Sequence, residues 1–146
     1  MSVTTPDEAL HPGDSFTAPI WVESHSSYID GAAAFLTFDP SVLHVVTITA
    51  GDRLTSVLHE RIDNQTGSVH FAAGDLTASV SGRFLLAEVK FAAVGPGQSE
   101  IIFLRSTPLE SDVTAGGASI LANTVDGSVR VEASQTPQLY LPLIGR

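Results

Sequence analysis

The sequence has 146 residues, 43% of them hydrophobic and 16% charged, a composition that excludes a disordered tail, a collagen and a long charged helix. Seven basic residues against 16 acidic ones give a net charge of −9, which argues against nucleic acid or an anionic membrane as a partner. The absence of cysteine excludes a disulfide framework, a thiolate nucleophile and a cysteine-based zinc site.

Neither a membrane span nor an export signal is visible in the sequence. No apolar run approaches the roughly 20 residues that a membrane-spanning helix requires. The first ten residues, MSVTTPDEAL, lack the basic and apolar regions of a secretory signal. As printed, the chain is therefore expected to be soluble and not exported, and a secreted origin would require a longer precursor.

Short apolar segments with period-two alternation recur between clusters of Gly, Pro, Asp and Asn, and this pattern predicts an all-β sandwich or barrel. In residues 15–24 every second side chain from Phe16 to Val22 is apolar, which places them on one face and Trp21 on the other. Pro19 cannot donate a backbone hydrogen bond to a neighbouring strand, so this strand is expected at an edge or with that position turned outward.

The next predicted strand, residues 31–38, has Ala33, Phe35 and Thr37 on one face and Ala34, Leu36 and Phe38 on the other. A turn at Asp39-Pro40 leads into a β-branched strand that ends at Gly51. The mixed polarity of residues 51–67 is compatible with one short helical turn or a loop, and this stretch is left open.

Two later segments, GSVHF at 67–71 and GSVRV at 127–131, each follow a turn-rich stretch, so each is interpreted as a turn that opens a strand. In the strand predicted between them, at 83–94, alternation places Leu86 and Glu88 outward and their neighbours inward. Further strands are expected at 99–104 and within 110–124.

Eight or nine strands result, without an internal domain boundary. They should pair antiparallel, because the connections are too short for crossover helices. We assign residues 1–132 to one β-sandwich domain and residues 133–146 to an apolar, Pro-containing C-terminal tail.

Several of these segments together resemble the cohesin domains of bacterial cellulosome scaffolds and their non-cellulosomal relatives, over roughly residues 12 to 132. The most specific is FDPSVLHVVTITAG, which is similar to that family's aromatic-Asp-Pro-x-Val-Leu-x-Val-Val run. The strand GSVHF followed by AAGD, the strand AEVKF and the closing DGSVRV strand also match.

The resemblance implies a nine-stranded β-sandwich with jelly-roll topology and an extracellular or cell-surface setting. It also implies a place in a polysaccharide-degrading or adhesive assembly. The implied partner is a dockerin, a calcium-loop helix pair carried by another protein.

The sequence departs from that family at two positions. In the best-known cohesins, the strand ahead of the aromatic-Asp-Pro turn presents Asn and Asp side chains that hydrogen-bond the dockerin. Aligned on FDP, these positions are Gly31 and Ala33 here, and neither has a side chain that makes such bonds. The resemblance therefore implies a more apolar recognition face centred on Phe35, suited to another dockerin type or to another partner.

The expected partner-binding surface is a flat, largely apolar patch, a feature that on a monomer commonly marks an interface. Its predicted members are Phe35, Ala33, Thr37, His70, Ala72, Leu86 and Glu88. The alternative is that the C-terminal tail or a second copy of the chain covers this patch.

Catalytic and metal motifs are not apparent, so neither an enzyme, a cofactor nor a metal is expected. The five histidines are never closer than eleven residues, so no pair has metal-ligand spacing. No D-x-D-x-D calcium loop is present, although Asp63, Asn64 and Asp75 could meet in space. The nucleophile motif G-x-S-x-G and the phosphate-binding loop are also missing.

Two other functions stay open behind protein binding. An outward Trp21 could stack on a sugar, although such a ring is more often covered by a neighbouring loop or by the N-terminal segment. With one Trp and two Tyr the chain is poorly supplied with the coplanar rings of a polysaccharide site, so a carbohydrate-binding module is the second hypothesis. The third is a structural spacer in a surface protein.

Overall fold

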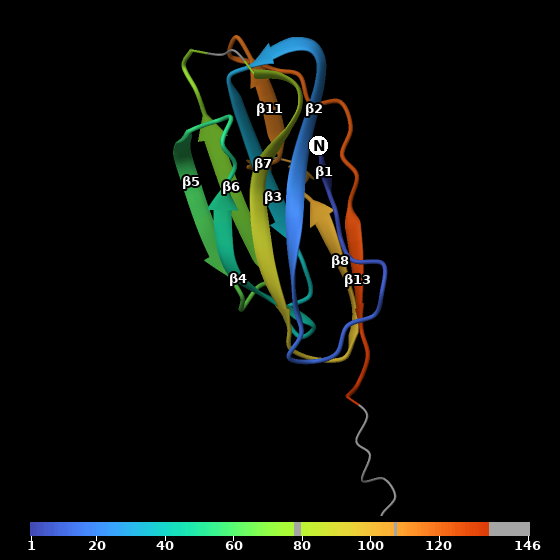
Figure 1. Cartoon of the computed structure of the whole chain (residues 1–146). Helices are drawn as coiled ribbons and strands as arrows, with labels where there is room; N and C mark the ends of the chain where they lie inside the picture. The colour runs from blue at the N-terminus through green and yellow to red at the C-terminus, as the bar shows by residue number, and fades with distance from the viewer. Residues whose placement is uncertain (78–79, 107, 135–146) are drawn as a thin grey trace, which may run out of the picture.

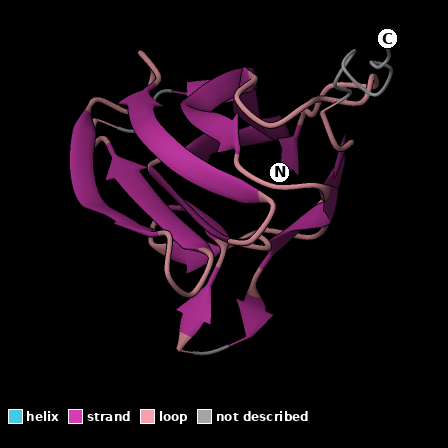
Figure 2. Cartoon of the chain, turned by 90° about the horizontal axis from the view of Figure 1, so that it is seen from below, coloured by secondary structure: helices cyan, strands magenta, loops and turns pink. Residues whose placement is uncertain are grey.

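The computed structural model describes residues 1–77, 80–106 and 108–134, and the regular structure in these ranges is entirely β (Figure 1). Two sheets pack face to face, as the view from below also shows (Figure 2). The predicted β-sandwich is confirmed. The described residues contain no helix of the length and apolarity that a membrane crossing requires.

The first sheet has the strand order β1-β2-β7-β4. Its strands are β1 (Ser2–Val3), β2 (Ser15–Ile29), β7 (Val80–Ala93) and β4 (Leu43–Ala50). Strand β7 is central, because it pairs with β2 along one edge and with β4 along the other.

The second sheet has the order β12-β11-β3-β6-β5, with β8 and β13 attached through β3. Its strands are β12 (Ala118–Ser119), β11 (Asp112–Ala115), β3 (Gly31–Thr37), β6 (Ser68–Gly74), β5 (Ser56–Asp63), β8 (Gly97–Phe103) and β13 (Gly127–Val131). Two further strands of two residues each, β9 (Arg105–Ser106) and β10 (Leu109–Glu110), pair with one another in a separate antiparallel ladder. One edge of β3 is shared, since β11 pairs with its start and β8 with its end.

Every pairing between these described strands is antiparallel, as the short connections predicted. Two isolated bridges, Ser2 to Val125 and Leu10 to Val131, are parallel and fix the N-terminal segment beside the end of the domain. The predicted tail at 133–146 lies, from residue 135 onward, outside the described residues.

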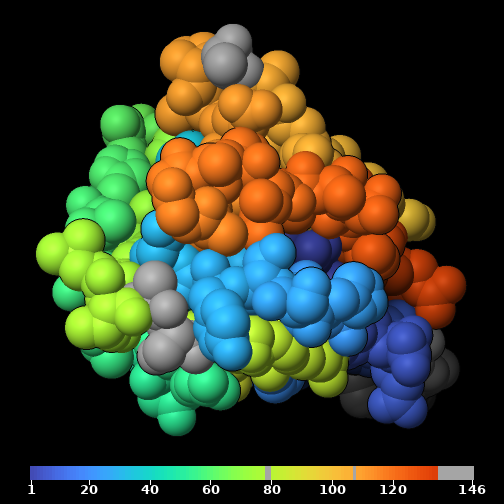
Figure 3. Space-filling model, turned by 90° about the horizontal axis from the view of Figure 1, so that it is seen from above, coloured from blue at the N-terminus to red at the C-terminus, as the bar shows by residue number. Residues whose placement is uncertain are grey.

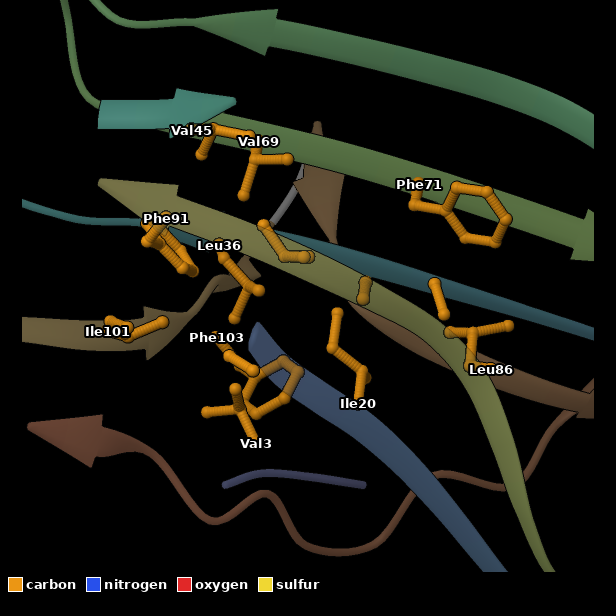
Figure 4. Close-up of a cluster of buried hydrophobic side chains, with 14 of the residues drawn as sticks. Val3, Ile20, Leu36, Val45, Val69, Phe71, Leu86, Phe91, Ile101 and Phe103 are labelled. Atoms are coloured by element: carbon orange, nitrogen blue, oxygen red, sulfur yellow. The ribbon is translucent and has the colours of Figure 1, made fainter. Parts of the chain in front are cut away.

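The core fills the space between the two sheets with the alternating side chains that the sequence pattern identified (Figure 4). In β3 burial alternates strictly, with Ala32, Ala34 and Leu36 inward. Phe91 of β7 is fully buried and stacks on Phe16 at a ring-centroid distance of 5.3 Å. Burying each large apolar side chain contributes about 1.5–3 kcal/mol, so this layer is the main source of stability.

Strand β7 departs from the predicted alternation. A register shift pairs Ile20 with Ala87 but Trp21 with Leu85, so Leu86 is an extra residue in the ladder. Such a bulge reverses the facing of the residues on one side of it. Leu86 is consequently in the core at 1% exposure, and Leu85, expected inward, is only half-buried.

Residues 51–67, whose structure the sequence did not decide, contain strand β5 (Ser56–Asp63). A helical turn or a loop is therefore wrong for residues 56–63. Its side chains are nearly all exposed because β5 is an edge strand, and without a buried face the sequence needs no alternation. A turn connects it to β6, in which Asp63 Oδ1 accepts hydrogen bonds from the Gln65 and Thr66 amides. Gly67 closes the turn at φ 82°, where a Cβ would lie 2.1 Å from the Phe38 carbonyl oxygen.

Candidate functional site

Strands β3 and β6 bring five of the predicted surface residues together on the outward side of the second sheet. Phe35 pairs directly with His70, and Ala33 pairs directly with Ala72. Thr37 lies two residues further along β3 and points to the same side. These five side chains, Ala33, Phe35, Thr37, His70 and Ala72, are called the Phe35 face below.

The expectation that Leu86 and Glu88 belong to this face is wrong. Both lie on β7 in the opposite sheet, because the chain crosses from one sheet to the other after β6. Leu86 is also buried in the core. Glu88 is half-buried between β2 and β4, opposite Pro19 and Thr49.

Strand β5, and not β7, lies beside β6. His59 pairs with Ala72 and Arg61 with His70, so both residues extend the Phe35 face. The sequence pattern does not reveal these residues, because an exposed edge strand shows no period-two alternation. The turn signature DNQTG immediately before GSVHF was the signal available, since such a turn indicates a hairpin and hence a strand on its other side.

An aromatic cluster forms the middle of the face. The Phe35 ring lies edge-to-face against His70, with centroids 4.8 Å apart, and against His59 at 6.3 Å. His70 is only 7% exposed, and its Nε2 has no hydrogen-bond partner among the described residues. Burial, and then repulsion from His59 and Arg61, lowers the pKa of the His70 imidazole below its ordinary value of 6.5. The ring is therefore neutral at pH 7.

A buried serine fixes the backbone of Phe35 from the side. Ser111 Oγ accepts a hydrogen bond from the Phe35 amide at 3.0 Å and donates one to the Phe35 carbonyl at 3.2 Å. The Leu104 amide donates to the same carbonyl at 2.7 Å. These bonds close the gap on the edge of β3 between the parts paired with β11 and β8, so the anchor of the Phe35 face is held rigidly.

A shallow hollow of about 190 Å³ lies beside the aromatic cluster and is called the alanine hollow below. It is lined by Gly31, Ala32, Ala33, Leu58, Ala72, Ala73, Asp112 and Thr114. A register shift between Val57 and His59 makes Leu58 the extra residue of a bulge in β5. This residue stands as a wall of the hollow and is 70% exposed.

Beyond the end of β3, the neighbouring strands β8 and β13 carry polar side chains on the surface. Gln98 Nε2 donates to Glu100 and to Ser128, and Ser128 Oγ also donates to Glu100. Between this network and Phe35, Ile102 pairs with Thr37 and adds an exposed apolar side chain. An apolar centre with a polar rim is the usual anatomy of a protein interface.

Trp21 lies on the other sheet, away from the Phe35 face. It is half-buried and paired with Ser2 of β1, and the Arg83 guanidinium lies 4.2 Å over its ring centroid. The side chain over the ring is therefore Arg83 of strand β7, and not a loop or the N-terminal segment as expected. The Arg83 guanidinium occupies one face of the ring, so a sugar cannot stack on that face.

A larger hollow of about 540 Å³ opens beside Trp21 at the end of the sandwich seen in Figure 3, between β2 and the segment around residue 120. Within the described lining, Trp21 is the only Trp, Tyr or Phe side chain. Polysaccharide sites usually need several coplanar rings, so this geometry gives little support to carbohydrate binding.

The three residues considered for calcium do not meet. Asp63 organises the β5–β6 turn, and Asn64 is bonded to both backbone groups of Val45. Asp75 follows the opposite end of β6, where its Oδ1 accepts from Thr77. Within residues 1–77, 80–106 and 108–134, no cluster of three or more His, Asp or Glu side chains could hold a metal ion.

A comparison with known protein families shows to which family this chain belongs. A family model for the cohesin domain matches residues 1–131. The chain belongs to the cohesin domain family. Cohesin domains are non-catalytic interaction modules, which agrees with the absence of catalytic motifs from the sequence. A sequence search of curated proteins found no match.

Solved cohesin structures share the jelly-roll β-sandwich of this cohesin domain. The third cohesin of ScaC from Acetivibrio cellulolyticus, solved in complex with the ScaB dockerin, matches with TM-score 0.72 and 18% identity over 90% of this chain and 99% of that one. The non-cellulosomal cohesin of Archaeoglobus fulgidus matches with TM-score 0.71 and 16% identity over 89% and 88%. A type II cohesin from the Acetivibrio cellulolyticus cellulosome gives TM-score 0.71 and 19% identity over 88% and 92%.

Proposed function

We propose that this cohesin domain binds a dockerin-type module of another protein through the Phe35 face. We place it in a secreted or cell-surface assembly that degrades polysaccharide or mediates adhesion. The observation that carries the proposal is the outward surface of β3 and β6, with an aromatic residue held by backbone hydrogen bonds at its centre and a polar rim. Two solved relatives of the same fold are complexes with dockerins.

The binding energy must come mainly from apolar contacts. Ala33 in the face and Gly31 beside it offer no polar side-chain atom, so hydrogen bonds with the partner must come from other positions. Interfaces of this kind concentrate affinity in a few central residues. Truncating a central aromatic residue costs roughly 2 kcal/mol or more, which is about thirtyfold in affinity.

The test is a titration of purified dockerin modules against the wild-type domain and two variants. The panel holds the ScaB dockerin of Acetivibrio cellulolyticus and every dockerin-like module encoded in the genome that carries this chain. Phe35→Ala should weaken binding about thirtyfold. Lys90→Ala is the matched control, because Lys90 is exposed on β7 of the opposite sheet. It should change affinity less than about fivefold.

Calcium removal should affect the dockerin partner and leave the cohesin domain unchanged. Dockerins are calcium-loop helix pairs, so a chelator should abolish binding by unfolding the dockerin, while the circular dichroism of the cohesin domain stays unchanged. Equal affinities for the wild type, Phe35→Ala and Lys90→Ala would show that binding uses another face. Failure of every dockerin in the panel to bind would reject the proposed partner class.

A further inference from the structure

The alanine hollow is formed by small residues and one displaced leucine. Gly31 has no Cβ, and a Cβ there would lie 2.9 Å from Thr114 Oγ1, so the position does not accept a larger residue without a shift. Beside it, Ala33 and Ala72 pair directly and provide only methyl groups. The bulge in β5 places Leu58 over this floor, where it is held close to Gly74.

The polar side chains in the lining already have partners within the domain. Thr114 Oγ1 donates to Asp30 Oδ1 at 2.6 Å. Asp112 Oδ1 accepts from the Val113 amide and from the Ser119 hydroxyl. The remaining side-chain acceptors are the other carboxylate oxygen of Asp112 and the lone pairs of Thr114 Oγ1. A guest that needs several hydrogen bonds would lose its hydration on the alanine floor without replacement, which costs free energy.

The size of the hollow indicates one side chain as its guest. Its volume of about 190 Å³ lies below the roughly 300–1,000 Å³ of sites for small-molecule ligands. Helical partners insert apolar anchor residues into grooves of this kind. Leu58 is exposed in the free domain and would be removed from water when such an anchor enters.

We propose that the alanine hollow receives one aliphatic side chain, such as Leu, Ile or Met, from the dockerin-type partner, and that this insertion selects the partner. The inference rests on the proposed function and adds the chemistry of recognition to it. Partners that present Asn, Asp or Ser at the contacting position are rejected, because the hollow offers their polar atoms too few partners.

A first experiment tests the hollow without any partner protein. Methyl chemical shifts of the labelled domain are followed during titration with N-acetyl-leucine amide or N-acetyl-asparagine amide. The leucine probe should shift the methyl signals of Ala33, Ala72 and Leu58, whereas the asparagine probe should leave them in place. Ala72→Leu, which fills the hollow, should abolish the response. Equal shifts with both probes, or none with the leucine probe, would overturn the inference.

A second experiment uses the dockerin that the wild-type domain binds. Ala72→Leu should weaken binding about thirtyfold, and Leu58→Ala, a variant at an exposed position that leaves the core intact, at least fivefold. Lys90→Leu is the control, because Lys90 is exposed on β7 of the opposite sheet and the variant adds bulk outside the Phe35 face. Wild-type affinity in both hollow variants, together with a loss in Phe35→Ala, rejects the hollow and keeps the proposed function. Wild-type affinity in Ala72→Leu, Leu58→Ala and Phe35→Ala alike would reject the whole Phe35 face as the binding surface.

Discussion

The buried, unpaired histidine of the Phe35 face makes the stability of the domain depend on pH in a defined direction. His70 lies between Phe35 and His59, with Nε2 away from water and without a hydrogen-bond partner in the described structure. Burial, then repulsion from His59 and Arg61, lowers its pKa in the folded state, while Asp63 opposes the shift weakly. In the unfolded chain the same imidazole titrates near 6.5.

The direction of the pH dependence follows from the difference between the pKa of His70 in the folded domain and in the unfolded chain. Well above pH 6.5 the imidazole is neutral in both states, so His70 then makes stability independent of pH. As the pH falls below 6.5, the unfolded chain takes up a proton that the folded domain resists, and stability decreases until the folded pKa is reached. A single proton limits the slope to about 1.4 kcal/mol per pH unit. The pKa values of the Asp30, Asp39, Asp63 and Asp75 carboxyls are lowered from their usual 3.8, so their protonation affects stability mainly below about pH 5, outside the range of His70.

The assay is urea unfolding followed by the fluorescence of Trp21, at pH values between 8 and 5, for the wild type and His70→Gln. The variant removes the titrating group, so its free energy of unfolding should fall less steeply between pH 6.5 and 5. His25→Gln changes an exposed histidine and should retain the wild-type slope. Parallel profiles for wild type and His70→Gln would refute the reasoning, because they would show that His70 takes up its proton equally in both states.

Three further predictions concern the framework of the face. Leu36→Ala, at a fully buried position of β3, should lower the free energy of unfolding by about 2–5 kcal/mol in urea, and a loss below about 1 kcal/mol would mean that the core layer is misplaced. Ser111→Ala leaves the Phe35 amide without its side-chain partner, so it should cost about 1–3 kcal/mol by thermal unfolding, with Ser106→Ala on exposed β9 as a neutral control. A chelator should change neither the far-ultraviolet circular dichroism nor the melting temperature, and a loss of β signal would reveal a structural metal.

The strands with one buried face could be predicted from the sequence because burial imposes the alternation that the sequence displays. Strand β3 shows this most clearly, since each of its inward residues is buried and Phe35 faces outward as expected. Strand β6 was predicted for its turn signal, which places Gly67 at the start of the strand. These two strands supply all of the predicted surface residues that the structure brings together.

The remaining surface residues could not be predicted from local pattern. A bulge adds one residue to β7, and a period-two extrapolation across it assigns Leu86 to the wrong side. An edge strand with both faces in water has no pattern to detect, which concealed His59 and Leu58 of β5. Which sheet a strand joins depends on pairing between segments far apart in the chain, and the alternation within one strand carries no information about it.

The most direct test of the central claim is to map the bound partner on the isotope-labelled domain. Amide and methyl chemical shifts are recorded with and without a dockerin module that binds, in the presence of calcium. The account predicts changes concentrated on Phe35, Ala33 and Ala72 and on the neighbouring residues of β5, with Lys90 on the opposite sheet unaffected. Changes centred on the outward faces of β2, β7 and β4, with Phe35 unaffected, would contradict it.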